Sequence, residues 1–341
     1  MELWEKYDVY TYLFWNVLSS SRYWLININE RIQIMEIFTT MITPYKADGS
    51  VDYQTAEKYV DWYFENGLDG IFAVCQSSEI FYLSLDERVK LNELVYARAK
   101  QLEKDSGKKL TVVSSGHISD TIEEQAKELN AIYTSGTDAL ILITNRLDIN
   151  NKGDDVFIRN AEKLLKLLSE DAKLGLYECP YPYKRLVTPK ILDWCLSTGR
   201  FVYMKDTCCD IDVIKNRCRQ LEGSGFKLLN ANCQTLLESI HCGGSGYCGI
   251  MCNFHPRLYA WLGANFDQEP KKAELIQSVI GIFGFTEDSL PYPLTAKYHM
   301  CLCDIPTENI ARNHKSEELT RYAKNCMNQM KLATDYFEKM L

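Results

Sequence analysis

The chain has 341 residues, the length of one large barrel with an appendage or of two domains of ordinary size. Its 46% hydrophobic and 25% charged residues exclude a disordered chain, a collagen-like repeat and a coiled coil. The formal net charge is −8 and no cluster of Lys and Arg offsets it, which excludes the electrostatic surface of a nucleic-acid-binding protein.

The first 34 residues differ from the remainder of the chain. They contain eight aromatic residues without the period of a helix or a strand, and regular patterns begin only at Met35. We therefore treat residues 1–34 as an N-terminal extension and hypothesise that the native protein starts at Met35. The first eight residues carry Glu2, Glu5 and Asp8 instead of the basic start of a secretory signal.

The cysteines and the hydropathy pattern indicate the cellular compartment in which we expect the protein. Thirteen cysteines, an odd number, are scattered from Cys75 to Cys326, unlike the paired framework of a small secreted domain. No apolar run approaches the roughly 20 residues that span a bilayer. We expect reduced thiols, a cytoplasmic location, and neither a membrane nor a nucleic acid as partner.

From Met35 onward, short apolar segments alternate with amphipathic segments. The spacing of Ala56 to Phe64 predicts a helix that ends at Gly67, and Ser84 with Glu87 forms a capping box that opens another. Asp120 with Glu123 predicts a further helix start. The predicted strands are 36–43, 71–74, 110–113, 139–143, 174–178, 201–205, 227–230 and 247–252. Beyond Asp267 the patterns are helical only, over 270–284, 291–301 and 316–341.

Near-continuous apolar strands that alternate with helices indicate a parallel sheet covered on both faces. Eight such units fit a closed (β/α)8 TIM barrel better than an open sheet. The sequence therefore predicts an α/β fold, with a barrel over residues 35–266 and a C-terminal helical region over residues 267–341.

In such a barrel the active site lies at the C-terminal ends of the strands. Lys205 closes an apolar strand, where desolvation favours the neutral amine that Schiff-base chemistry requires. Tyr177 ends the preceding strand and is a candidate proton donor. Ser77 and Ser78 follow the second strand and offer hydroxyl and N–H groups suited to a carboxylate.

Each of these residues also has a structural interpretation. A lysine at a strand end is usually a surface residue, a single tyrosine is usually part of the core, and two serines after a strand usually form a turn. Joint placement on one barrel rim favours a functional site. The cysteines and histidines lack ligand spacing, so we expect no metal and no cofactor, and we interpret His117 as a loop residue rather than a pocket residue.

Several segments resemble the dihydrodipicolinate synthase and N-acetylneuraminate lyase family of class I pyruvate-dependent aldolases. The resemblance extends from about Met35 to Leu341, with its motifs in family order. Cys75–Glu79 stands at the place of that family's Gly-Thr-Thr-Gly-Glu carboxylate loop. The other matching segments are Phe38–Tyr45 with Asp48–Asp52, Leu83–Arg88, Tyr177–Pro180, Lys205–Thr207 and Gly243–Gly246.

The resemblance implies a role for several residues. Lys205 would form an imine with pyruvate, and Tyr177 would be the general acid and base. Gln76 and Ser77 would hold the pyruvate carboxylate, Thr207 would contact a hydroxyl of the acceptor, and Cys248 would line the pocket by its backbone. It also implies a homo-oligomer, a dimer or tetramer.

Some positions depart from the family pattern. Gln76 replaces the first threonine of the loop, and Pro182 stands where the synthases carry an arginine, with Arg185 nearby. The second tyrosine of the synthases falls near Leu147. Cys233 and Gln234 stand where sialic acid lyases carry two acidic residues. The departures argue against both activities.

The sequence therefore predicts a Schiff-base, pyruvate-dependent aldolase or lyase that acts on a 2-keto acid, such as a 2-keto-3-deoxy acid. Its substrates would be pyruvate and an aldehyde acceptor, or the 2-keto acid that they form. A keto-acid dehydratase or a dihydrodipicolinate synthase-type condensation remains an alternative within enzymes. An alternative of another class is a barrel that binds a ligand without catalysis.

Overall fold

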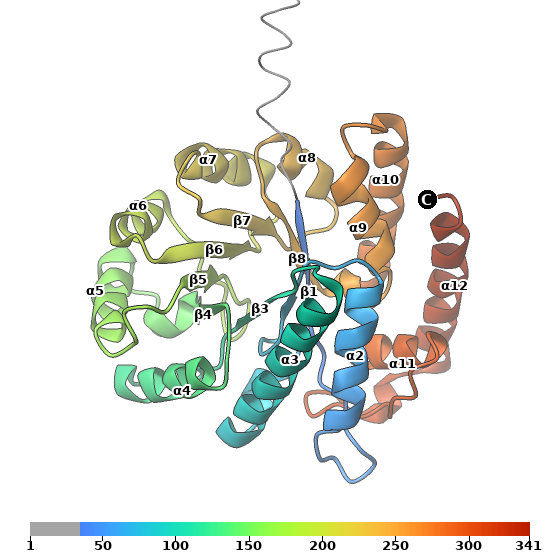
Figure 1. The fold of residues 1–341 in the computed structure, drawn as a ribbon, viewed down its shortest axis with the longest axis horizontal. Helices are drawn as coiled ribbons and strands as arrows, with labels where there is room; N and C mark the ends of the chain where they lie inside the picture. Colours follow the sequence, from blue (N-terminus) through green and yellow to red (C-terminus); the bar gives the residue numbers. More distant parts are fainter. Residues whose placement is uncertain (1–34) are drawn as a thin grey trace, which may run out of the picture. The chain divides into compact units, whose positions relative to one another are not determined.

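The computed structural model describes residues 35–341, so the predictions made for residues 1–34 lie outside the described residues. Eight parallel strands form a closed barrel in sequence order, and β8 pairs with β1 (Figure 1). This confirms the predicted TIM barrel. The strands are β1 (Glu36–Thr40), β2 (Gly70–Phe72), β3 (Thr111–Ser114), β4 (Ala139–Ile143), β5 (Leu174–Tyr177), β6 (Phe201–Asp206), β7 (Lys227–Asn230) and β8 (Gly246–Gly249).

A helix follows each strand, and three more helices complete the chain, as the predicted C-terminal appendage requires. The helices that follow the strands are α2 (Tyr53–Glu65), α3 (Leu85–Ser106), α4 (Ile122–Thr134), α5 (Asp154–Leu165), α6 (Pro189–Thr198), α7 (Ile211–Leu221), α8 (Leu236–His241) and α9 (Pro256–Asn265). The last three are α10 (Pro270–Glu287), α11 (Leu294–Leu302) and α12 (Arg321–Glu338). Over residues 35–341, none of the helices combines the length and the apolar character needed to cross a membrane.

Helix capping explains where several helices begin. Ser84 and Glu87 form the predicted capping box of α3. The predicted start of α4 is wrong by one residue, because Thr121, and not Asp120, accepts the hydrogen bond from the backbone N–H of Glu124. Asp and Thr are both good caps, so two adjacent candidates compete for this position. The predicted helix over 316–341 is also divided, since Thr320 caps α12 anew.

Two strands, β1 and β8, end three residues earlier than predicted. β1 ends at Thr40 and β8 ends at Gly249, where a 3₁₀ turn over Ile250–Asn253 begins. The side-chain amide of Asn253 donates hydrogen bonds to the carbonyl oxygens of Thr40 and Ile250, at 2.9 Å each. A buried side chain thus satisfies backbone oxygens that a longer sheet would have used.

Closure of the barrel depends on one glycine. Gly246 opens β8 with φ of +151°, and a Cβ there would lie 1.9 Å from the carbonyl oxygen of Glu36 on β1. A larger residue would push the two strands apart. Glycine at this position therefore lets β8 pair with β1.

Candidate active site

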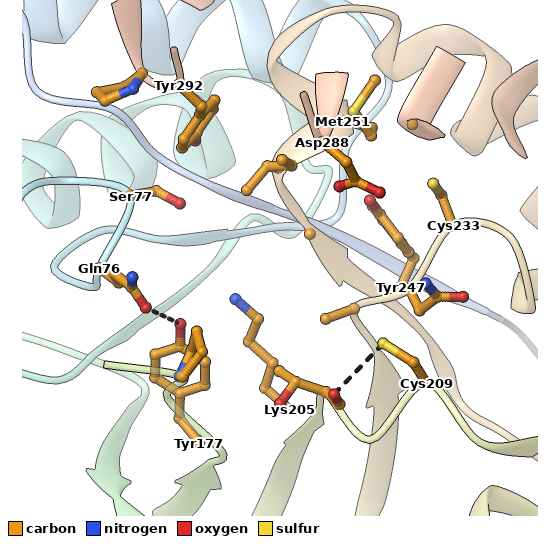
Figure 2. A pocket seen from close by; sticks show the side chains of 18 of the residues that line it. Gln76, Ser77, Tyr177, Lys205, Cys209, Cys233, Tyr247, Met251, Asp288 and Tyr292 are labelled. Carbon is orange, nitrogen blue, oxygen red and sulfur yellow. Dashed lines mark hydrogen bonds between the residues drawn. The ribbon is translucent and has the colours of Figure 1, made fainter. Parts of the chain in front are cut away.

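A cavity of about 440 Å³ lies at the C-terminal ends of the strands. Residues that follow β2, β5, β6, β7 and β8 line it, together with residues of the C-terminal helical region (Figure 2). Five of the six residues that we assigned to a site are on its wall: Gln76, Ser77, Tyr177, Lys205 and Thr207. Among these five residues, Gln76 and Thr207 lie farthest apart in the sequence, by 131 positions, and the fold brings both to one cavity.

Lys205 and Tyr177 are paired residues on the neighbouring strands β6 and β5. The Lys205 Nζ lies 4.3 Å from the centroid of the Tyr177 ring and 5.7 Å from that of Phe72. Only 8% of Lys205 is exposed, and its amine is directed into the cavity (Figure 2). The amine therefore rests against two aromatic faces and is open to a ligand in the cavity.

The Tyr177 hydroxyl donates a hydrogen bond to Oε1 of Gln76 over 3.3 Å. The Cys179 Sγ donates to the same oxygen, also over 3.3 Å. Burial raises the pKa of Tyr177 well above its usual value. Tyr177 is therefore a neutral phenol over the physiological pH range, and it holds a proton close to the amine of Lys205.

The two serines after β2 have different roles. Ser78 Oγ accepts from the backbone N–H of Cys75 at 2.6 Å and donates to the Cys75 carbonyl at 2.9 Å, so it stabilises the turn. Ser77 lines the cavity and donates to Oγ1 of Thr40 on β1 at 2.9 Å. The structural interpretation therefore holds for Ser78, whereas the Ser77 hydroxyl lies on the cavity wall, where it can turn from Thr40 to a ligand.

A buried ion-pair cluster fixes the ends of β5 and β6. Arg217 on α7 places Nη2 2.6 Å from Oε1 of Glu178, and its Nη1 donates to Oδ2 of Asp206. Glu178 follows Tyr177 in the chain and Asp206 follows Lys205. One guanidinium therefore ties together the residues next to the two central side chains of the site.

Thr207 lines the cavity, but its proton is used elsewhere. Its Oγ1 donates to the carbonyl oxygen of Glu178 at 2.7 Å, and its backbone N–H donates to Oε2 of Glu178 at 2.9 Å. The hydroxyl oxygen can still accept a hydrogen bond from a ligand.

Cys248 does not line the main cavity. It lines a small cavity inside the barrel, below the site, that Lys205 and Phe72 also border. Its neighbours Tyr247 and Gly249 lie on the main wall, because successive residues of a strand face opposite sides. Burial raises the pKa of the Cys248 thiol to about 12, so the thiol stays neutral.

Of the positions that depart from the family pattern, some line the cavity and others do not. Arg185 forms ion pairs with Asp148 at 3.0 Å and Asp154 at 2.8 Å, and it is not on the cavity wall. Leu147 is fully buried. Cys233 and Gln234 do line the cavity, on the side of β7.

His117 is a structural residue, as expected, although it is buried. The backbone N–H of Ile143 donates to its Nε2 at 2.7 Å, and its Nδ1 lies 2.9 Å from Oε1 of Gln125. These partners suit a neutral ring that donates from Nδ1. Burial lowers the pKa of His117 to about 4.

The C-terminal helical region supplies wall residues that the sequence analysis missed. Asp288, Tyr292, Asn313 and His314 line the cavity. The segment that carries Asn313 is held to the loop after β2, where Glu79 accepts from the backbone N–H of Asn313 at 3.1 Å. The buried amine of Lys297 on α11 lies 2.7 Å from the same carboxylate group. These residues follow no motif, and only the folded chain brings them to the barrel rim.

The part of the chain that the structure describes contains no group of three or more His, Cys, Asp or Glu side chains placed to hold a metal ion. It includes all thirteen cysteines, and each of them is a free thiol.

Comparison with known proteins identifies relatives for this arrangement. The model of the "Dihydrodipicolinate synthetase family" matches residues 33–145. A 4-hydroxy-tetrahydrodipicolinate synthase of Neisseria meningitidis is 28% identical over 229 residues, which are 64% of this chain and 71% of the relative.

Solved structures share the fold. The dihydrodipicolinate synthase (DHDPS) of Cyanidioschyzon merolae with lysine bound has a TM-score of 0.77 at 19% identity, over 89% of this chain and 99% of that chain. The chloride-inhibited dihydrodipicolinate synthase of Acinetobacter baumannii complexed with pyruvate has a TM-score of 0.74 at 18% identity, over the same shares of 89% and 99%. The sequence matches and the shared barrel agree: over residues 33–145 the chain is similar to the dihydrodipicolinate synthetase family, and its fold is that of the solved synthases.

Proposed function

We propose that this chain is a class I aldolase or lyase that binds pyruvate as an imine on Lys205. It would make or break the carbon–carbon bond at the methyl carbon of pyruvate. The observation that carries the proposal is the buried Lys205 amine, which faces Tyr177 at 4.3 Å from its ring centroid and is directed into the cavity. The relative from Acinetobacter that was solved with pyruvate supports the choice of ligand.

The chemistry assigns a step to each of these two residues. The lone pair of the Lys205 amine attacks the C2 ketone, and a proton passes from the nitrogen to the ketone oxygen. The resulting carbinolamine loses that oxygen as water once it gains a second proton. Tyr177 is a neutral phenol and donates that proton. The deprotonated Tyr177 then takes a proton from C3, which gives an enamine. The C3 of the enamine bonds to the carbonyl carbon of an aldehyde, whose oxygen receives that proton back from Tyr177. The reverse sequence cleaves a 2-keto acid.

The cavity wall offers two sets of polar groups. Gln76 and Ser77 follow β2 and suit the pyruvate carboxylate. Thr207 after β6, Asn232 after β7 and Asp288 after α10 offer hydrogen-bonding groups for an acceptor that carries hydroxyls. Among the described residues, no arginine lines the cavity. This favours a 2-keto-3-deoxy acid over a substrate whose distant carboxylate needs a guanidinium.

The test is pyruvate release from a panel of 2-keto-3-deoxy acids of increasing chain length. We expect cleavage of at least one acid by the wild type and by Lys215→Ala, an exposed lysine on α7. We expect none by Lys205→Ala. Turnover of every acid without pyruvate release would indicate a dehydratase. Pyruvate binding without cleavage or condensation of any substrate would favour a barrel that only binds its ligand.

A further inference from the structure

We propose that Tyr292 is a substrate-binding residue that donates a second hydroxyl hydrogen bond to the pyruvate carboxylate, beside Ser77. This inference rests on the proposed function. Tyr292 lies between α10 and α11, outside the barrel, yet its side chain is on the cavity wall. Figure 2 shows it on the same side of the cavity as Ser77, above the amine of Lys205.

The first support is the orientation of the Tyr292 hydroxyl. The side-chain amide of Asn253 donates to the Tyr292 oxygen at 3.2 Å. Asn253 is itself fully buried and is held in place by the hydrogen bond that it donates to the Thr40 carbonyl. The two protons of the Asn253 amide serve three acceptors, the carbonyl oxygens of Thr40 and Ile250 and the Tyr292 oxygen, so one proton is shared. The amide nitrogen cannot accept a hydrogen bond, so the Tyr292 oxygen accepts there and its own proton points to another partner.

The second support is the group of hydroxyls around that proton. Ser77 Oγ donates to Thr40 Oγ1 at 2.9 Å. Burial raises the pKa of Tyr292, and interaction with the Ser77 and Thr40 side chains opposes this rise. Ser77 and Tyr292 line the same cavity, and the Asn253 amide contacts both the Thr40 carbonyl and the Tyr292 hydroxyl, so the three hydroxyls lie close together. They come from β1, from the loop after β2 and from the C-terminal helical region.

The chemistry of this wall selects its ligand. Three adjacent hydroxyls hold three protons, and each hydroxyl can turn to point its proton at a ligand. A carboxylate accepts several hydrogen bonds and has no proton to donate, so it suits such a wall. Its negative charge would be balanced by the protonated imine on Lys205, within the same cavity. In this arrangement Tyr292 adds a hydroxyl donor beside the Nε2 protons of Gln76, whose Oε1 accepts from Tyr177.

The test measures borohydride trapping of the Lys205 adduct against ketone concentration, with pyruvate and with acetone, which lacks the carboxylate. Three proteins are compared: the wild type, Tyr292→Phe and Tyr63→Phe. Tyr63 is the matched control, since its hydroxyl donates to Oδ1 of the same Asn253 at 2.6 Å but it is absent from the cavity wall.

We expect Tyr292→Phe to raise the pyruvate concentration for half-maximal trapping by roughly tenfold, as for one lost hydrogen bond to a charged group. Trapping with acetone should not change, and Tyr63→Phe should match the wild type with both ketones. An unchanged pyruvate dependence in Tyr292→Phe would overturn the inference. An equal loss with acetone would do the same, because it would show a general structural effect.

If the proposed function is wrong, the wild type traps neither ketone, a result that differs from the failure of this inference. Calorimetric binding of pyruvate then decides the role of Tyr292. Weaker binding by Tyr292→Phe than by Tyr63→Phe would support the carboxylate contact, and equal affinities would refute it.

Discussion

Tyr177 and Lys205 face each other as a registered pair at the ends of β5 and β6, with the Lys205 Nζ 4.3 Å from the centroid of the Tyr177 ring. The pairing of the two strands fixes this relationship, and Arg217 reinforces it from behind through Glu178 and Asp206. The Tyr177 ring thus lies beside the amine without a flexible loop between them.

The Tyr177 hydroxyl is expected to affect the rate of the chemistry more than the fold. Tyr177→Phe removes the proton donor but keeps the ring that contacts Lys205. Turnover of the best 2-keto acid should fall by roughly a hundredfold or more, as for loss of a general acid and base. Steady-state kinetics measure this, and a decrease of less than threefold would remove Tyr177 from the proton transfer.

The Arg217 cluster is expected to contribute to stability. Arg217→Met leaves the buried carboxylates of Glu178 and Asp206 without their cation, which should cost roughly 3–5 kcal/mol of the free energy of unfolding. Urea denaturation measures the loss. As a control, Arg217→Met combined with Glu178→Gln and Asp206→Asn should recover most of it, since no buried charge is left unpaired. A loss below about 1 kcal/mol in Arg217→Met would contradict the assigned role.

His117 is expected to make the protein less stable in acid. Burial lowers its pKa to about 4, from 6.5 in the unfolded chain. Between these values the unfolded state binds the proton and the folded state does not, so stability falls as the pH falls from 6.5 to 4. His117 contributes up to about 1.4 kcal/mol per pH unit to this slope.

The corresponding measurement is urea denaturation at several pH values from 7 to 4. His117→Asn should reduce the slope, whereas the same change at the exposed His241 should leave it as in the wild type. Equal slopes in His117→Asn and the wild type would show that folding does not lower the pKa of His117.

We predict that the chain forms dimers or tetramers. Large apolar side chains are exposed on one side of α12, where Tyr322 is 70%, Leu332 73% and Tyr336 65% exposed. On α10, Ile282 is 65% and Phe285 76% exposed. Apolar patches of this kind mark interaction surfaces. Light scattering at micromolar concentration should give at least twice the monomer mass, and Phe285→Glu with Leu332→Glu should reduce it. A monomeric wild type would refute the prediction.

Most of the barrel could be predicted because its strands are short apolar runs between capped helices. The predicted bounds of β4 (Ala139–Ile143) and β7 (Lys227–Asn230) agree with the structure to the residue. The predicted bounds are wrong where a distant side chain binds the backbone at a strand end, or where two adjacent residues can both cap a helix. Asn253 ends β1 from more than two hundred residues away, and Thr121 displaces Asp120. Long-range contacts of this kind leave no local pattern.

The gathering of Gln76, Ser77, Tyr177, Lys205 and Thr207 in one cavity was predictable, since strand ends meet on one rim of a barrel. Cys248 was placed on the wrong wall because alternation along β8 turns it inward. Tyr292 and Asp288 could not be found, because they come from beyond the last strand. The position of these two residues on the cavity wall depends on tertiary packing, which no residue spacing in a single sequence predicts.

The most direct test of the account is peptide mapping of the protein after incubation with pyruvate and borohydride. Reduction converts an imine into a stable secondary amine, so the modified lysine is identified by mass. If Lys205 forms the imine, the adduct lies on the peptide that contains Lys205, and Lys205→Ala carries none. An unmodified Lys205 peptide, or an adduct of equal yield in Lys205→Ala, would contradict it.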